Sequence, residues 1–144
     1  MNAIDYGFKS YYDYIRSSID SLSVFIQIEH KDAVAELDEI VKNPYIDGYI
    51  LGPNDLSGSY GMPGDILSEK ITGVIKYTVD KLHNADKYVG IASGGCSPEI
   101  LEHWSGFGVE MLSAGADFDF LREGAAANRI NLEKIHKKNC CLPT

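Results

Sequence analysis

The chain has 144 residues, of which 13 are Lys or Arg and 21 are Asp or Glu, so its formal net charge is −8. Hydrophobic residues make up 44%, which is typical of a globular domain rather than of a disordered or membrane-embedded chain. Nucleic acids and anionic membrane surfaces are bound through clusters of Lys and Arg, and this acidic sequence has no such cluster. The composition therefore predicts a single domain over residues 1–144, with no nucleic acid and no membrane among its partners.

The sequence also predicts the compartment. Its longest apolar runs, such as residues 22–28, are far shorter than the roughly 20 residues that cross a bilayer. The first residues lack the basic and then apolar order of a secretory signal. The three cysteines, Cys96, Cys140 and Cys141, form neither a disulfide framework nor a CxxC metal motif. We therefore expect a cytoplasmic protein with free thiols.

The first third of the chain alternates between the helical and the strand period. Apolar residues at intervals of three to four over residues 8–19 predict an amphipathic helix. Residues 22–28 are short, β-branched and nearly all apolar, as in a strand that is buried on both faces. One apolar face over residues 32–41 predicts a helix that ends before Pro44. Residues 46–51 predict a second buried strand.

The alternation continues after a glycine-rich and proline-rich loop at residues 52–64. The predicted elements are, in order, a helix at 67–86, a strand at 88–92, a helix from an N-cap at Ser97 to Gly106, a strand at 109–114 and a helix at 117–138 with a break near Asn128. Four successive βα units predict an α/β fold with a parallel sheet. A closed (β/α)₈ barrel needs eight units and roughly 250 residues, so the chain supplies about half of one. An open doubly wound sheet fits the length, but its GxGxxG turn is absent.

Polar residues follow the first two predicted strands. Gln27 and Glu29 are two positions apart, which places both on one face of the first strand, and Asn54 and Asp55 follow the second strand. Ligands of parallel α/β proteins bind at these carboxyl ends, and neighbouring strands are about 4.8 Å apart. Glu29 and Asp55 can therefore share one Mg²⁺ or Mn²⁺ ion, since both ions accept one or two carboxylates with water and an oxygen-rich substrate. The spacing alone leaves open that each acid is a solvated loop residue or a helix cap.

Three segments resemble a known family: Phe25-Ile-Gln-Ile-Glu-His30, Ile46-Asp-Gly-Tyr-Ile-Leu-Gly-Pro-Asn-Asp-Leu-Ser57 with the following Gly58-Ser-Tyr-Gly-Met-Pro-Gly64, and Val89-Gly-Ile-Ala92. They look like the second half of the HpcH/HpaI aldolases, metal-dependent pyruvate-type aldolases related to the citrate lyase β-subunit. The resemblance implies the four C-terminal βα units of a (β/α)₈ TIM barrel, a half-barrel truncated at its N-terminus, from a family that is usually hexameric with swapped terminal helices. It implies a carbon–carbon lyase that cleaves or forms a 4-hydroxy-2-oxo acid, with pyruvate and an aldehyde as the other reactants.

The resemblance also assigns site residues. Glu29 and Asp55 match the two ligands of the Mg²⁺ or Mn²⁺ ion, and Gln27 matches a glutamine that contacts the substrate. The backbone amides of Asn54 and Asp55 are expected to hold the pyruvate carboxylate. Ser93 follows the third predicted strand, in a loop that faces the site in this family, and is expected to contact the substrate.

One part of the family's machinery has no counterpart. The general base, a histidine, and an arginine that stabilises the transition state come from the first half of the barrel. His30 is the one histidine beside the predicted site, but strand alternation directs it away from Glu29. Two alternatives therefore stay open: a catalytically silent half-barrel that serves binding or assembly, and a citrate-lyase-like enzyme that cleaves an acyl thioester. A half-barrel leaves two sheet edges unpaired, so we also expect a homo-oligomer or a complementing half-barrel.

Overall fold

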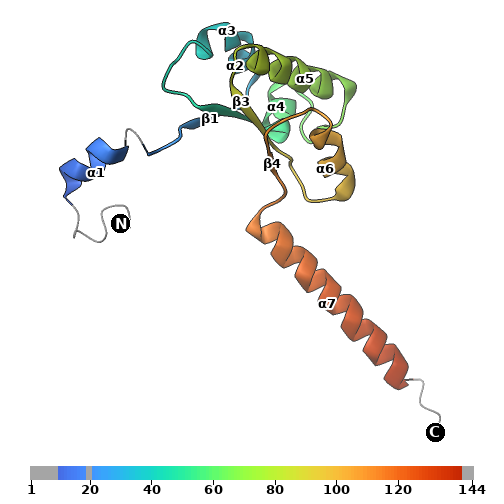
Figure 1. The fold of residues 1–144 in the computed structure, drawn as a ribbon. Helices are drawn as coiled ribbons and strands as arrows, with labels where there is room; N and C mark the ends of the chain where they lie inside the picture. The colour runs from blue at the N-terminus through green and yellow to red at the C-terminus, as the bar shows by residue number, and fades with distance from the viewer. Residues whose placement is uncertain (1–9, 19–20, 141–144) are drawn as a thin grey trace.

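The computed structural model describes residues 10–18 and 21–140. It contains one four-stranded parallel sheet with the order β1-β2-β3-β4 (Figure 1). The strands are β1 (Phe25–Ile28), β2 (Gly48–Leu51), β3 (Tyr88–Ala92) and β4 (Met111–Ser113). Each strand is followed by helix, which confirms the predicted run of four βα units in an α/β fold.

Seven helices lie within the described residues. They are α1 (Tyr11–Ser18), α2 (Lys31–Ala35), α3 (Leu37–Ile40), α4 (Pro53–Ser59), α5 (Glu69–Asn84), α6 (Pro98–Ser105) and α7 (Asp117–Cys140). Helices α2 to α6 lie next to the sheet, whereas α1 and α7 extend away from it (Figure 1). None of the helices described is long and apolar enough to span a membrane.

The hydrophobic core lies between one face of the sheet and the helices. The strands contribute side chains that are at most 1% exposed, namely Ile28, Tyr49, Leu51, Val89 and Ile91. The helices contribute a second set, which includes Leu37, Leu56, Ile71, Ile75, Leu82 and Trp104. Alternate residues of each strand therefore point to the helices, as the pleat requires.

The opposite face of the sheet carries large apolar side chains that stay exposed. Strand register places Phe25, Gly48 and Tyr88 in one row, with Phe25 45% and Tyr88 64% exposed. Two residues further along the strands, on the same face, Met111 is 45% exposed and lies beside Gly90. Parallel sheets are almost always covered on both faces. Within the described residues, helices cover one face of this sheet, and the other face is left largely uncovered.

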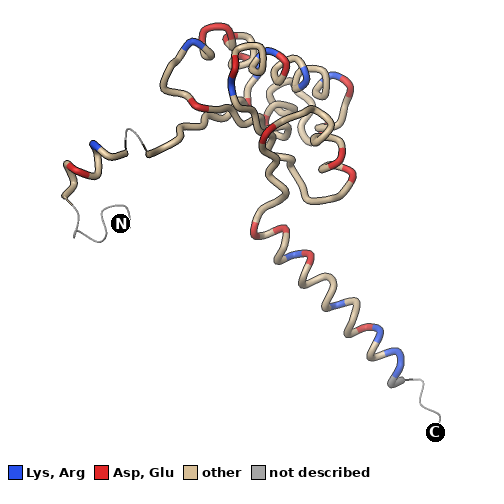
Figure 2. Tube along the Cα trace, viewed as in Figure 1, with Lys and Arg blue, Asp and Glu red and all other residues tan. Residues whose placement is uncertain are grey.

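Charges follow the helix dipole on α7. Its first turn contains Asp117 and Asp119, and its last turn contains Lys137 and Lys138. Figure 2 shows acidic side chains at the start of this helix and basic ones near its end. Anions are favourable at a helix N-terminus and cations at a C-terminus. This arrangement helps to stabilise a helix that packs against little else.

Four expectations from the sequence are wrong in detail. The strand predicted at residues 22–28 begins at Phe25, and only Ile28 of it is buried, because β1 is an edge strand with one uncovered face. The helix predicted at 32–41 divides into α2 and α3 at Glu36, a residue outside regular helical geometry. The predicted loop at 52–64 contains α4. Helix α7 continues through Asn128, since three alanines before it have the highest helix propensity.

Candidate functional site

The carboxyl end of β1 holds two polar side chains in contact. Gln27 Nε2 donates a hydrogen bond of 2.8 Å to Glu29 Oε1. The shared face that strand alternation predicts for these residues is confirmed by this contact. Gln27 is exposed and Glu29 is half-buried, so the carboxylate is held in one orientation while solvent and ligands still reach it.

Helix α4 begins directly after β2 and carries the other two predicted residues. Gly52 is its N-cap and Pro53 its first residue, where a fixed φ favours helix and the missing N–H has no cost. The first bond of the helix runs from the Leu56 N–H to the Gly52 carbonyl, at 2.9 Å. The N–H groups of Asn54 and Asp55 thus lie in the first turn, where a helix provides no acceptor of its own. They can bind an anion there.

A buried leucine and a serine fix this short helix in place. Leu56 and Ser57 are 0% exposed. The Ser57 hydroxyl donates to the Asn54 carbonyl at 2.7 Å and accepts from the Gly64 N–H at 3.1 Å. Tertiary packing therefore maintains a helix whose glycines and serines have low intrinsic propensity.

Glu29 lies against the start of α4. A Cβ atom added at Gly52 would be 3.0 Å from Glu29 Oε1, which is a tight contact, and 2.9 Å from Glu29 Cγ, which is closer than real Cβ atoms approach. Gly52 thus provides the space that the Glu29 carboxylate occupies, next to the helix that carries Asp55. No group of three or more His, Cys, Asp or Glu side chains in the described part of the chain is placed to hold a metal ion. Glu29 and Asp55 carry the carboxylate oxygens that Mg²⁺ and Mn²⁺ prefer, and their role as ligands of such an ion stays a prediction.

His30 and Ser93 have local partners. His30 Nδ1 accepts the Asp32 N–H at 3.3 Å, as the N-cap of α2, and its side chain is 57% exposed. The Ser93 hydroxyl is buried and donates to the Gly95 carbonyl, while the Ser93 carbonyl accepts the indole N–H of Trp104 at 3.1 Å. In this geometry His30 caps a helix and Ser93 shapes the loop after β3. Their predicted roles toward a substrate stay predictions.

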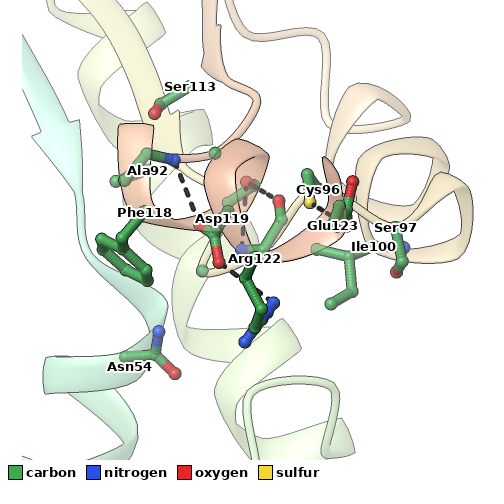
Figure 3. A pocket seen from close by; sticks show the side chains of 15 residues that line it. Asn54, Ala92, Cys96, Ser97, Ile100, Ser113, Phe118, Asp119, Arg122 and Glu123 are labelled. Atoms are coloured by element: carbon green, nitrogen blue, oxygen red, sulfur yellow. Dashed lines mark hydrogen bonds and ion pairs between the residues drawn. The ribbon is translucent and has the colours of Figure 1, made fainter. Parts of the chain in front are cut away.

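A cavity of about 560 Å³ opens at the carboxyl ends of β3 and β4 (Figure 3). Asn54 lies on one side of it, and the start of α7 forms the other. Asp119 Oδ2 accepts the Ala116 N–H and its Oδ1 accepts from Arg122, both at 3.1 Å. The Cys96 thiol donates to Glu123 Oε1 at 2.9 Å. This hydrogen bond, together with partial burial, raises the pKa of Cys96, which keeps the thiol protonated at neutral pH.

The cavity residues Cys96, Asp119, Arg122 and Glu123 are not among those that the sequence predicts for the site. Their position after the third and fourth strands is the signal that points to them, because ligands bind at the carboxyl ends of all strands in such a sheet. They carry no recognisable motif, and only the contact between the β3 loop and α7 brings them together.

Known proteins resemble this chain in sequence and in fold. The family model described as HpcH/HpaI aldolase/citrate lyase matches residues 1–100. A 2-keto-3-deoxy-L-rhamnonate aldolase of Escherichia coli is 30% identical over 105 residues, which are 73% of this chain and 39% of that protein. A hydroxypyruvate/pyruvate aldolase of Delftia acidovorans is 32% identical over 116 residues, which are 81% of this chain and 42% of that protein.

Among solved structures, an HpcH/HpaI aldolase/citrate lyase family protein of Burkholderia cenocepacia superposes with a TM-score of 0.75 at 24% identity. The superposition covers 90% of this chain and 49% of that one. The chain thus spans about half the length of the solved structure and about two fifths of the curated relatives that it matches.

Proposed function

Because the chain belongs to the HpcH/HpaI aldolase/citrate lyase family, we propose that it is the C-terminal half-barrel of a carbon–carbon lyase. The reaction is the cleavage of a 4-hydroxy-2-oxo acid to pyruvate and an aldehyde, or the reverse condensation. One observation carries the proposal: the Gln27–Glu29 pair lies against Gly52, at the start of the helix that carries Asp55. The aldolase names of the relatives agree with it.

The first-turn amides of α4 bind the 2-oxo acid. The Asn54 and Asp55 N–H groups donate to its carboxylate, and the positive end of the helix dipole adds to the attraction. Glu29 and Asp55 hold the divalent ion, Mg²⁺ or Mn²⁺, and Gln27 orients the Glu29 carboxylate through its hydrogen bond. When bound, such an ion polarises the keto oxygen and stabilises the charge that develops on it during cleavage.

A general base is the part of the machinery that these residues do not provide. His30 is the N-cap of α2 and is directed to the Asp32 backbone. We propose that a complementing half-barrel or a second copy of the chain supplies the base. The exposed side chains of Phe25, Tyr88 and Met111 on the uncovered sheet face support this, as do the open edges of β1 and β4. The alternative, a silent binding module, is favoured by the same missing base.

We propose the cytoplasm as the compartment. Cys96 is a free thiol in contact with Glu123. Free cysteines persist in reducing compartments.

Proton NMR of pyruvate in D₂O tests the function. With Mg²⁺, the chain should bind pyruvate and exchange its methyl protons slowly, since a general base typically contributes about 10²–10⁴-fold. Adding the first half of a homologous barrel should accelerate the exchange. Asp55→Asn should abolish both binding and exchange, whereas the surface variant Asp80→Asn should change neither. Pyruvate binding that persists in Asp55→Asn would contradict the proposed site.

A further inference from the structure

The uncovered face of the sheet alternates large and small residues between neighbouring strands. Its large apolar side chains are those of Phe25, Ile50, Tyr88 and Met111. Glycines separate them, because strand register places Gly48 between the two aromatic residues and Gly90 between Ile50 and Met111. A Cβ atom at Gly90 would be 2.8 Å from Ile50 Cδ1 and 3.2 Å from Met111 Cβ, so the large side chains lie over the glycine. Such alternation is typical of residues that fill the interior of a small closed barrel.

The two edges of the sheet fit each other. Within the described residues β1 and β4 each pair with one strand, and all four strands run in the same direction. A twofold rotation about an axis parallel to the strands keeps two copies of the sheet parallel. It also brings β4 of each copy beside β1 of the other. Eight parallel strands close a barrel that side chains can fill, so two copies leave no open edge.

The composition of the uncovered face suits contact with an identical face. A twofold contact places a surface against its own copy, where charges of one sign would repel. The row of Phe25 and the row of Met111 contain no charged residue, and Gln27 is their one polar member. Antiparallel pairing of like edges, such as β1 with β1, would give an open sheet with the apolar side chains still in water. Closure removes both the edges and the exposed apolar surface.

We propose that two copies of this chain close one eight-stranded barrel around a twofold axis. The carboxyl ends of all eight strands then lie at one rim, with neighbouring strands about 4.8 Å apart. At this rim, Glu29 and Asp55 of each copy gain a second wall from the loop after β4 of the other copy. The shared site rests on the proposed lyase function, whereas the closure of the barrel does not.

Sedimentation equilibrium of the full chain tests the closure. At micromolar concentration the wild-type chain should have twice the chain mass of 15.9 kDa. Met111→Glu should raise the dissociation constant of the dimer at least about hundredfold, because each barrel would enclose two additional like charges. Tyr45→Glu introduces the same charge in the turn before β2, at a residue that is 81% exposed, and should leave the dissociation constant unchanged.

Methionine oxidation examines the same face without a substitution, so it does not depend on the folding of a variant. Met111 is 45% exposed in the single chain, and closure would bury it. Its oxidation by hydrogen peroxide, followed by peptide mass spectrometry, should be at least about fivefold slower above the dissociation constant than below it, since oxidation follows exposure. Met62, in the loop after α4, is the control and should react at the same rate at both concentrations.

Four results would overturn the closure: a monomer at all concentrations, association only with the first half of a homologous barrel, an unchanged dissociation constant in Met111→Glu, or oxidation of Met111 that does not depend on concentration. Proton NMR of pyruvate with Mg²⁺ reports on the site separately. A closed dimer that binds no pyruvate would refute the proposed lyase function but not the closure. Equal pyruvate affinity of monomer and dimer would refute the shared site.

Discussion

Gly52→Ala isolates the contact between Glu29 and the start of α4. The backbone of Gly52, with φ −106° and ψ 92°, accepts alanine without strain, so the whole cost falls on the neighbouring side chain. The new Cβ would lie 2.9 Å from Glu29 Cγ. Because non-bonded carbon atoms prefer about 3.5 Å or more, Glu29 must move by at least about 0.6 Å.

A shift of this size matters more for the ion than for the fold. Mg²⁺ demands near-ideal octahedral geometry with ligands at about 2.0–2.1 Å, so we expect its affinity to fall about tenfold, or about 1.4 kcal/mol. At saturating Mg²⁺ the metal-dependent part of the unfolding free energy should fall by about the same amount. For a chain of this length, the increase of Tm on adding Mg²⁺ should shrink by about 3–6 °C.

Thermal unfolding followed by circular dichroism, with and without Mg²⁺, measures this difference. Gly58→Ala is the matched control: it lies in the same helix, and a Cβ there meets nothing within 4 Å. It should raise stability by up to about 1 kcal/mol and keep the full Mg²⁺ response. An undiminished Mg²⁺ response in Gly52→Ala would refute the placement of Glu29 as a ligand against Gly52.

Three other predictions concern the fold and the cavity. Trp104→Phe should lower the unfolding free energy by about 2–3 kcal/mol in urea titrations, because it shrinks a fully buried side chain and orphans the Ser93 carbonyl; a loss below about 1 kcal/mol would contradict this. A hydrogen bond from the β3 backbone lowers the pKa of Glu110, so its contribution to stability is present above the ordinary glutamate pKa and is lost as the pH falls through the lowered value. Glu110→Gln should therefore flatten the pH dependence of unfolding between about pH 3 and pH 5, and an unchanged profile would count against this pairing. Glu123→Gln should lower the pKa of Cys96 and accelerate its alkylation by iodoacetamide at pH 7, measured on the Cys96 peptide by mass spectrometry; slower alkylation would show that Glu123 does not set this pKa.

The sequence predicts the four βα units and the shared face of Gln27 and Glu29 because both follow from local periodicity. Alternation in β1 needs no tertiary information, and strand–helix alternation restricts the topology. Helix α4 is different: its N-cap Gly52 and its first residue Pro53 carry a start signal, but the glycine and serines that follow have low propensity. The burial of Leu56 decides in favour of helix, and burial is a tertiary property.

The cavity was less accessible to prediction for a related reason. Asp119 and Glu123 belong to one helix, whereas Cys96 comes from a loop more than 20 residues earlier. No spacing rule connects them, and only the contact of the Cys96 thiol with Glu123 does so. The general base of the proposed reaction is a similar case: His30, which follows Glu29 in the sequence, is the N-cap of α2, and no spacing rule identifies another candidate.

The uncovered sheet face links assembly to the proposed site. Strand register places Gln27 in one row with Ile50, Gly90 and Met111. A partner that covers the whole row, from Met111 on β4 to Gln27 on β1, would also lie close to Glu29, which follows Gln27 by two residues. Exclusion of water there strengthens the attraction between the carboxylates and a cation, since the local dielectric constant falls. If the proposed function holds, a partner that covers this face would stabilise the sheet and shield the proposed site from water, so complementation should raise Mg²⁺ affinity and Tm together.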